Sequence, residues 1–197
     1  MTAIIAAIGA ETGLMGYKSP EGKGMLPWKP GTFPEDMKHF FTPNTTRDTG
    51  IVVMGPETYA SLPKKFRPLS DRISVVITRN GEYEIPKGDV EAPLHVFDSL
   101  GRMFSFVKEK YPNNPIWFAG GPRFMRVALP YTEEILLTRF QENTLPKRDL
   151  GNVKPVAFQE ITQGDWARQW RRTWDSPPQV SRSGITFWRE RWKRLPH

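Results

Sequence analysis

The chain has 197 residues, of which 38% are hydrophobic and 25% charged, a balance typical of a globular protein with a sizeable core. Cysteine is absent, which excludes disulfides, thiolate chemistry and cysteine metal sites, and we expect a cytoplasmic protein. The histidines His39, His95 and His197 are not spaced as ligands, so no metal is expected. No apolar run approaches ~18 residues and no basic segment precedes the first apolar run, so neither a membrane span nor a signal peptide is expected.

In chain order, short β-rich runs alternate with helical segments. Ala3–Ile8 reads as a buried strand, and 13–25 reads as a glycine-rich loop. Further β-rich runs lie in the segments 50–54, 72–80, 92–97, 115–118 and 133–141. This alternation predicts an α/β fold, with a mainly parallel central sheet, flanking helices and an antiparallel C-terminal hairpin. No linker divides the chain, so residues 1–197 are expected to form one domain.

Two of the expected helices carry terminal signals. Thr32 and Glu35 form a capping box that predicts a helix start near Phe33, with Pro34 in the first turn. The apolar residues at helical spacing, expected to face the core, are Met37, Phe40 and Phe41. A second helix follows 92–97, with Asp98 as its expected cap. The apolar face of this second helix contains Leu100, Met103, Phe104 and Val107.

Asp36 lies where the first of these helices begins. It is next to Met37 and one turn before Phe40, so its carboxylate should border the apolar face of the helix instead of plain solvent. A first-turn acid also complements the helix dipole, and the local sequence by itself favours this simpler interpretation of Asp36.

Two strand–Gly–Pro–helix joints occur, at Gly55–Pro56 and Gly121–Pro122. Glycine permits close backbone approach, and proline fits the first helical position. The backbone N–H groups then expected at the carboxyl edge of the sheet belong to Glu57, Thr58, Arg123 and Phe124. Helix N-termini at such an edge bind phosphate, and Arg79 follows a third strand, so the joints suggest a diphosphate-bearing ligand. The alternative is that both are tight turns.

The net charge of +7 is concentrated near the C-terminus. From Trp166 to His197 there are eight Lys or Arg residues and five of the seven tryptophans. Basic residues interleaved with aromatic ones can bind nucleic acid. However, the segments 166–174 and 184–192 flank a turn rich in Pro, Ser and Gly, which predicts a hairpin. We therefore expect a structural hairpin and no nucleic-acid partner.

Motifs that follow one another along the chain are "AIIAAIGAETGLMG", "GMLPW", "PEDMKHF", "IVVMGPETYASL", "RPLSDRISVVITRN", "IWFAGGP", "ILLTRF" and "DWARQW…GITFWRERW". Each motif is loose by itself, but their order and spacing resemble those of the dihydrofolate reductase family over nearly the entire chain. The resemblance implies reduction of 7,8-dihydrofolate to 5,6,7,8-tetrahydrofolate, by hydride transfer from NADPH to pterin C6 and protonation at N5.

The resemblance also implies roles for individual residues. Asp36 would be the pterin-binding acid, accepting hydrogen bonds from the 2-amino group and N3. Because it holds the opposite edge of the ring from N5, solvent would deliver the proton while Asp36 raises the basicity of the substrate. Trp28 would hold an ordered water, Thr138 would hydrogen-bond Asp36, and Arg72 would pair with the glutamate tail. The implied substrate-binding residues are Ile5, Ala6, Leu26, Met37, Phe40, Leu69 and Arg72.

For NADPH the resemblance implies the residues Ala7, Gly16, Gly55, Pro56, Glu57, Thr58, Thr78, Arg79, Ala119, Gly120, Gly121, Pro122, Arg123 and Phe124. Thr78 and Arg79 would meet the 2′-phosphate, and the Gly120–Gly121 bond would be cis. The chain also departs from the family pattern. Pro56 stands where a basic residue is frequent, so 2′-phosphate recognition depends on Arg79. Ala119 replaces a larger aliphatic residue, and the mobile loop at 17–25 is longer than in short bacterial enzymes.

Two other functions compete with this one. A related pyrimidine reductase of riboflavin synthesis would share the fold, but it does not account for Trp28, Asp36 and Arg72 occurring together. A basic binding module with a reductase-like fold is supported weakly by the C-terminal tryptophans and arginines. The sequence leaves the oligomeric state open, with a monomer favoured.

Overall fold

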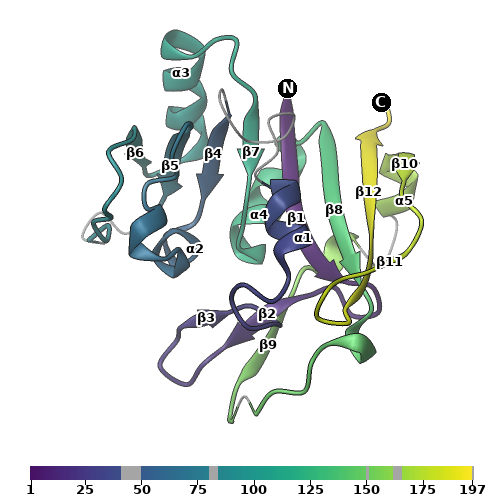
Figure 1. Cartoon of the computed structure of the whole chain (residues 1–197). Coiled ribbons are helices and arrows are strands. Elements are labelled where there is room, and N and C mark those ends of the chain that lie inside the picture. The colour runs from purple at the N-terminus through teal and green to yellow at the C-terminus, as the bar shows by residue number, and fades with distance from the viewer. Residues whose placement is uncertain (41–49, 80–83, 150, 162–165, 197) are drawn as a thin grey trace.

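The computed structural model describes residues 1–40, 50–79, 84–149, 151–161 and 166–196. Its main sheet has the strand order β10-β12-β8-β1-β7-β4-β5-β6, and β11 pairs with β12 (Figure 1). The bounds of these strands are β1 (Thr2–Gly9), β4 (Ile51–Met54), β5 (Ile73–Ile77), β6 (Leu94–Phe97), β7 (Ile116–Phe118), β8 (Glu134–Phe140), β10 (Trp170–Asp175), β11 (Gln179–Val180) and β12 (Thr186–Arg194).

The strands from β8 to β6 along this order pair in parallel, whereas β12 runs antiparallel to β8, to β10 and to β11. The predicted fold class is therefore confirmed, including the antiparallel C-terminal end. Parallel strands place their carboxyl ends at one edge of the sheet, which is the lower edge in Figure 1. A second sheet, made of β2 (Leu14–Lys18), β3 (Gly24–Met25) and β9 (Lys154–Ala157), lies near this edge, as does helix α2 (Pro56–Ser61).

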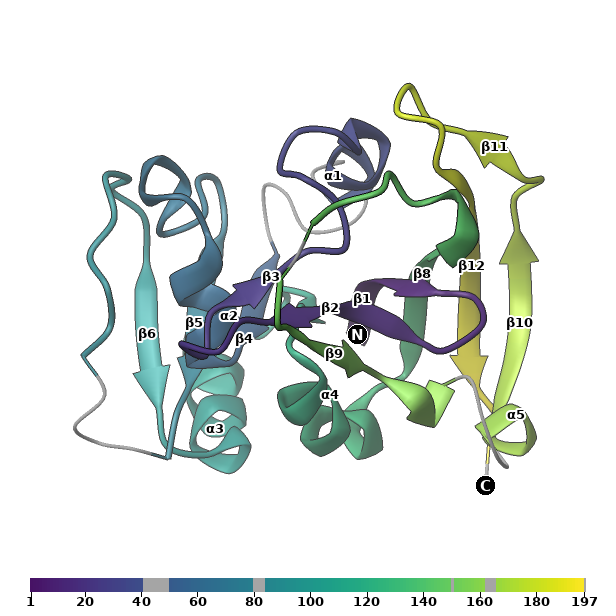
Figure 2. The same ribbon diagram turned by 90° about the horizontal axis from the view of Figure 1, so that it is seen from below.

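Helices cover both faces of the sheet. Their bounds are α1 (Pro34–Phe40), α2 (Pro56–Ser61), α3 (Leu100–Lys110), α4 (Pro122–Ala128) and α5 (Trp166–Gln169). Short 3-10 turns occupy Lys64–Phe66, Leu129–Tyr131, Glu142–Thr144 and Gln159–Ile161. Figure 2 shows α1 on one side of the sheet and α3 and α4 on the other.

The core lies on both faces, because successive residues of a strand point to opposite sides. The cluster under α3 and α4 includes Ile4, Ile8, Val53, Val75, Phe118, Leu137, Leu100, Met103, Val107, Met125 and Ala128. The cluster on the other face includes Ala3, Ile5, Val52, Met54, Val76, Trp117, Leu136, Tyr59 and Leu69. Burial on both faces explains why these strands read as continuous apolar runs.

The segment 13–25 is not simply a loop, as the sequence predicted. It contains β2 (Leu14–Lys18) and β3 (Gly24–Met25), which pair with each other, and β2 also pairs with β9 (Lys154–Ala157). A β-carbon at Gly16 would collide with the carbonyl oxygen of Met25, so the close approach of these strands requires glycine. The pairing joins segments far apart in the chain, and a local pattern does not reveal it.

Helix α1 begins at Pro34, one residue after the predicted start. The predicted capping box does not close, because the backbone N–H of Thr32 donates to the carbonyl oxygen of Lys29 at 3.1 Å and Oε1 of Glu35 accepts from the backbone N–H of Arg182 at 3.2 Å. Phe40 packs partly against the cluster around Tyr59, but Met37 is 40% exposed, so the prediction that it faces the core is also wrong. Phe41 lies outside the described residues.

Helix α3 has the predicted apolar face but a different cap. The Ser99 hydroxyl accepts a hydrogen bond from the backbone N–H of Arg102 at 3.4 Å, whereas Asp98 forms an ion pair with the Arg102 side chain at 3.0 Å. Serine and aspartate are both good N-cap residues and they are adjacent here, so the sequence alone did not distinguish them.

The C-terminal hairpin is confirmed by the pairing of β10 with β12, although residues 166–169 form α5 instead of extending the strand. Its basic and aromatic residues take part in the fold. The side chains of Trp188 and Trp192 donate to Glu190 at 2.9 and 2.8 Å, and Glu190 forms a buried ion pair with Arg139 at 3.1 Å. The Arg194 guanidinium lies 4.4 Å from the centre of a Trp170 ring.

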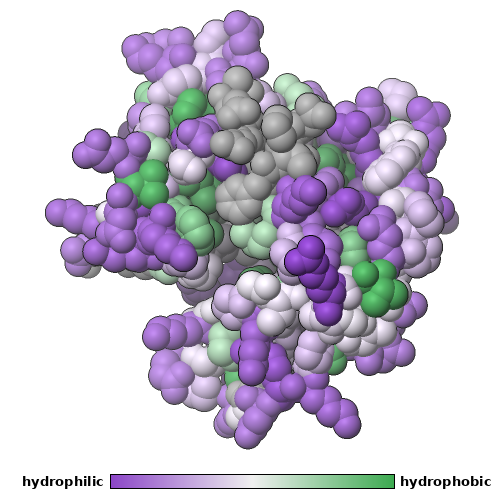
Figure 3. All heavy atoms as spheres, in the orientation of Figure 1, coloured by the Kyte–Doolittle hydropathy of each residue, from purple (hydrophilic) through white to green (hydrophobic). Residues whose placement is uncertain are grey.

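On the face shown in Figure 3, outside the atoms drawn in grey, hydrophobic side chains lie in small separate patches among polar ones. Within the described part of the chain, no helix is both long and apolar enough to cross a membrane.

Candidate active site

A half-buried acid on α1 meets a buried threonine on the face of the sheet. Asp36 is in the first turn of α1, and Thr138, which is 1% exposed, comes from β8. The Thr138 hydroxyl donates a hydrogen bond to the Asp36 carboxylate, as the family resemblance implied. Burial raises the pKa of Asp36 to about 6, while the Thr138 hydrogen bond and the positive charge of Arg189 oppose that rise. The carboxyl group is therefore poised to change charge near physiological pH.

Arg189 was missed by sequence reasoning. It is opposite Thr138 in the pairing of β12 with β8, and its Nη2 donates to the carbonyl oxygen of Glu35 at 3.0 Å. The hairpin was predicted, but eight basic residues lie in that region and alternation alone does not show which of them face α1. The strand register with Thr138 is the signal that identifies Arg189.

An aromatic cluster adjoins the acid. Its buried members are Trp28, Phe33, Phe140, Ile185 and Phe187. Trp28 is 3% exposed and makes edge-on contacts with Phe33 and Phe140, with ring centres 4.9 and 5.3 Å apart. Phe33 directly precedes α1, and Ala7, which is paired with Thr138 in the sheet, packs partly against the same cluster. The cluster therefore lies on the side of the sheet where Thr138 bonds Asp36.

The predicted apolar walls fall into two groups. Ile5 and Leu69 are buried in one cluster, with Phe40 packed partly against them, and Ala6 is half-buried. Leu26 and Met37 are 44% and 40% exposed, respectively. Leu26 lies on the segment before α1 and Met37 lies within α1, so an apolar ligand bound beside Asp36 would cover both side chains.

Arg72 lies just before β5 and is 5% exposed. Its Nε donates to the carbonyl oxygen of Ser70 at 2.9 Å, and its guanidinium carbon is 5.8 Å from the centre of the Phe40 ring. Helix α1 thus has Asp36 in its first turn and a contact with Arg72 at its last residue. Arg67 has a different environment, because its Nη1 donates to the carbonyl oxygen of Ala60 at the end of α2, at 3.2 Å.

The two Gly–Pro joints are adjacent in space. The backbone N–H of Gly55 donates to the carbonyl oxygen of Gly120 at 3.0 Å, and both α2 and α4 have proline in the first turn, as predicted. The Gly120–Gly121 bond is cis, as the resemblance implied, and Gly120 has φ +123°. The Thr58 hydroxyl lies 3.5 Å from where a β-carbon on Gly120 would stand. This places Thr58 against the backbone of the second joint.

The predicted cofactor residues at the sheet edge are placed as follows. Thr78 is half-buried and its N–H donates to the carbonyl oxygen of Phe97 at 2.9 Å, whereas Arg79 is exposed. The N–H of Ala119 donates to the carbonyl oxygen of Val53 at 2.9 Å, so Ala119 continues the pairing of β7 with β4. Ala7 packs partly against the aromatic cluster next to Asp36.

One ion pair connects the small sheet to α2. The Nζ of Lys18, on β2, lies 2.9 Å from Oε1 of Glu57, in the first turn of α2. Both side chains are exposed, so the pair adds little stability, but it places the β2–β3 hairpin beside the first Gly–Pro joint.

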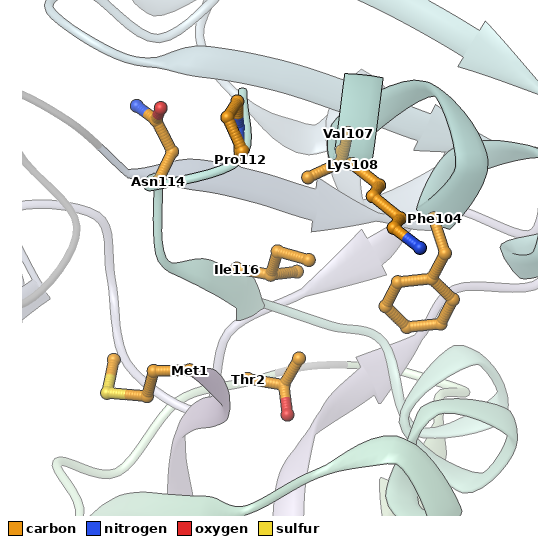
Figure 4. Close-up of a pocket in the computed structure, with 8 residues that line it drawn as sticks. All are labelled: Met1, Thr2, Phe104, Val107, Lys108, Pro112, Asn114 and Ile116. Atoms are coloured by element: carbon orange, nitrogen blue, oxygen red, sulfur yellow. The ribbon is translucent and has the colours of Figure 1, made fainter. Parts of the chain in front are cut away.

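The hollow in Figure 4 is at the other end of the molecule. It lies at the start of β1 and β7 beside α3, and Met1, Phe104 and Ile116 are among the residues that line it. None of the predicted site residues contributes to it. Among the residues that the structure describes, no group of three or more His, Cys, Asp or Glu side chains could hold a metal ion.

The strand order defines an α/β protein whose Gly–Pro joints meet at the carboxyl edge of a mainly parallel sheet, the edge at which open α/β folds bind their ligands. The structure matches a dihydrofolate reductase from Enterococcus faecalis, described as complexed with NADP(H) and RAB-propyl, with a TM-score of 0.71 and 22% identity over 100% of this chain and 97% of that one. The family model "Dihydrofolate reductase" matches residues 1–179. The chain belongs to the dihydrofolate reductase family, which confirms the resemblance seen in the sequence.

Curated relatives carry the same name. The dihydrofolate reductase of Schizosaccharomyces pombe is 32% identical over 130 residues, which are 60% of this chain and 27% of that protein. The dihydrofolate reductase of Heliothis virescens is 29% identical over 126 residues, covering 61% and 65%. The match to these two relatives therefore spans less than two thirds of their length. The Mycobacterium tuberculosis enzyme is 29% identical over 166 residues, covering 83% of both chains.

Proposed function

We propose that this protein reduces 7,8-dihydrofolate to 5,6,7,8-tetrahydrofolate with NADPH as the reductant. The observation that carries the proposal is the carboxylate of Asp36, hydrogen-bonded by Thr138 beside buried aromatic side chains, in a chain of the dihydrofolate reductase family. We further propose a cytoplasmic enzyme formed by one domain, and we favour a monomer without a nucleic-acid partner.

Asp36 binds and orients the pterin in this proposal. As a carboxylate it accepts two hydrogen bonds, from the 2-amino group and from N3, and a charged acceptor makes such a pair strong. Thr138 donates to the same carboxylate and so fixes its orientation. The aromatic cluster that contains Trp28 borders this side of the site with apolar surface, which strengthens these hydrogen bonds, and we propose that Trp28 holds one ordered water near the ring.

The reaction adds a hydride at C6 and a proton at N5. NADPH, when bound, supplies the hydride. Asp36 holds the ring edge opposite N5, so its task is electrostatic: the negative charge favours the protonated form of the bound substrate, and solvent delivers the proton. Leu26 and Met37, which are exposed in this structure, would cover the ring and limit the access of water.

The residues at the paired joints fit NADPH. Gly120 and Gly121 leave backbone space beside the Thr58 hydroxyl that a β-carbon would occupy, so a ligand can approach the backbone closely here. We propose that the joints and Thr58 hold the diphosphate and that Arg79, with Thr78, holds the 2′-phosphate. The full proposed set is Ala7, Gly16, Gly55, Pro56, Glu57, Thr58, Thr78, Arg79, Ala119, Gly120, Gly121, Pro122, Arg123 and Phe124.

The decisive test is NADPH oxidation by the purified chain with 7,8-dihydrofolate, followed by absorbance and by identification of tetrahydrofolate as the product. Turnover with dihydrofolate, and none with a ribosylated aminopyrimidine, is the expected result. Turnover with the aminopyrimidine alone would instead assign the chain to the riboflavin-type reductases. Absence of turnover with both substrates in a folded preparation would contradict the proposed function.

Arg79→Ala is expected to lower the preference for NADPH over NADH roughly tenfold, because a charged pair with the 2′-phosphate is lost. The rate at saturating NADPH should stay close to that of the unchanged protein. The measurement is kcat/KM with each cofactor. Arg172→Ala is the matched control, since Arg172 is an exposed arginine that pairs with Asp175 on β10, at the opposite end of the strand order from β5 and Arg79. Equal use of both cofactors by the unchanged protein would show that Arg79 does not bind the 2′-phosphate.

The basic hairpin is expected to bind nucleic acid only weakly and without sequence preference. Several of its charges and tryptophans are engaged in the fold, for example Trp192 in its bond to Glu190 and Arg194 in its contact with Trp170. Fluorescence anisotropy with short duplexes should show affinity at low salt that falls steeply toward ~150 mM salt, as simple charge attraction does. Tight binding that discriminates between sequences at ~150 mM salt would contradict this expectation.

A further inference from the structure

The position of Arg189 in the sheet directs its side chain toward Asp36. Arg189 on β12 is directly opposite Thr138 on β8, and directly opposed residues of an antiparallel pair project from the same face of a sheet. Thr138 bonds Asp36 from that face. The guanidinium of Arg189 therefore lies on the same side of the sheet as the first turn of α1.

Side-chain contacts hold the guanidinium there. Its Nη2 donates to the carbonyl oxygen of Glu35 at 3.0 Å, one residue before Asp36, and its central carbon lies 5.7 Å from the centre of the Phe187 ring. Its Nε is buried and has no hydrogen-bond partner among the described residues. An arginine keeps its charge under all physiological conditions, so this is a fixed positive charge at the border of an apolar cluster.

Other ionisable groups around Asp36 do not replace this charge. His39, one turn along α1, has its pKa lowered to about 4 by burial and by the charge of Arg189, so it is neutral at physiological pH. Glu35 is an acid, and its Oε1 accepts from the backbone N–H of Arg182 at 3.2 Å. Lys38, also on α1, is exposed to solvent, which screens its charge.

The neighbouring strands contribute two more arginines. Arg139, next to Thr138 on β8, points to the opposite face and forms a buried ion pair with Glu190. Arg72 lies beside the ring of Phe40, at the other end of α1 from Asp36.

We propose that Arg189 is a positioning residue for pterin reduction, which keeps Asp36 in its carboxylate form and fastens the first turn of α1 to β12. The inference rests on the proposed function, because it assigns Arg189 a role through Asp36 in that same site. Without a nearby cation, an acid desolvated as Asp36 is would be protonated more readily near neutral pH, and a protonated acid cannot accept hydrogen bonds from both the 2-amino group and N3 as a carboxylate does. Arg189 opposes the effect of burial.

The first test is the pH dependence of kcat/KM for dihydrofolate in Arg189→Met. Removing the cation disfavours the carboxylate, so the apparent pKa of the acidic limb should rise by about one pH unit, from about 6 toward 7. At pH 7 the ionised fraction of Asp36 would fall from about nine-tenths to about half. Arg189→Lys should restore most of the original profile, because it retains the charge.

Arg191→Met is the matched control. Arg191 lies two residues further along β12 and pairs with Glu134 at 3.1 Å, so its removal takes one guanidinium from the same strand without removing the charge beside Asp36. Its pH profile should coincide with that of the unchanged protein. The inference would be overturned if the apparent pKa of the acidic limb rose equally in Arg189→Met and Arg191→Met, or if it rose in neither.

The second test does not depend on turnover. Carbon-13 NMR of the Asp36 carboxyl, assigned by comparison with Asp36→Asn, measures its pKa directly in each variant. A rise in Arg189→Met and not in Arg191→Met supports the inference, and an unchanged pKa in a folded Arg189→Met overturns it. If Arg189→Met does not fold, Arg189→Gln, which keeps hydrogen-bond donors for Glu35, serves the same test. A protein that shows the NMR shift but does not reduce dihydrofolate would contradict the proposed function alone.

Discussion

Asp36→Asn is expected to lower kcat/KM for dihydrofolate roughly thirty- to a thousandfold near neutral pH, equivalent to roughly 2–4 kcal/mol of transition-state binding. The amide can still contact the ring, but it carries no negative charge to favour protonation at N5. The measurement is steady-state kinetics at saturating NADPH. Glu109→Gln is the control, because Glu109 is an exposed acid at the C-terminal end of α3 that pairs with Lys110, and its replacement should leave kcat/KM unchanged.

The pH profile adds a second readout for this substitution. The unchanged protein should lose activity as pH falls through about 6, where Asp36 takes up a proton. Asp36→Asn has no such group, so its residual activity should lack this limb. A variant with near-normal kcat/KM and the same acidic limb would contradict the role given to Asp36.

The same substitution should stabilise the fold at neutral pH. The pKa of Asp36 is raised from 3.8 to about 6, so the folded state binds this proton more tightly than the unfolded state does. The stability that this group contributes is present below pH 3.8 and is lost as pH rises through about 6. At pH 7 the charged group costs about 2 kcal/mol after allowance for partial exposure, and asparagine removes that cost. Urea unfolding at pH 7 and pH 4 should show the gain only at pH 7.

How much of the fold can be predicted from the sequence depends on how far apart along the chain the interacting segments lie. The runs that became β1, β4, β5, β7 and β8 are apolar enough to be recognised locally, since they are buried on both faces. The pairing of β2 with β9 joins residues 14–18 to 154–157, and no local pattern distinguishes that strand from a glycine-rich loop. The cap of α3 depended on a choice between two adjacent cap residues, Asp98 and Ser99, which only the backbone geometry decides.

The candidate site shows the same division. Asp36 and Thr138 were placed together because each lies within a motif whose order along the chain resembles the family, and the structure brings them into contact. Arg189 lies in the terminal motif "GITFWRERW", but the resemblance gave it no role, and its proximity to Asp36 follows from the register of β12 on β8. Met37 was expected in the core because helical spacing marks an apolar face, but spacing does not show whether that face meets protein or a ligand.

Arg72→Leu is expected to raise KM for dihydrofolate on the order of a hundredfold while changing kcat far less. Folate differs from a bare pterin by its glutamate tail, and a bidentate pair between the guanidinium and the tail carboxylate contributes about 2–3 kcal/mol to binding. This contact is far from the reacting atoms, so its loss weakens the ground state and the transition state equally. The measurement is kcat and KM for dihydrofolate and for a dihydropterin that lacks the glutamate. KM for the dihydropterin should not change in Arg72→Leu.

Arg67→Leu separates tail binding from structural support in this experiment. Arg67 lies in the same "RPLSDR" segment, but its guanidinium bonds the end of α2, so its loss should affect stability without raising KM selectively for the substrate with the tail. Arg72 is itself buried against Ser70 and the Phe40 ring, and a purely structural role would disturb α1 and therefore both substrates. Equal weakening of dihydrofolate and the bare dihydropterin in Arg72→Leu would mean that Arg72 supports α1 and that the glutamate tail is bound by another residue.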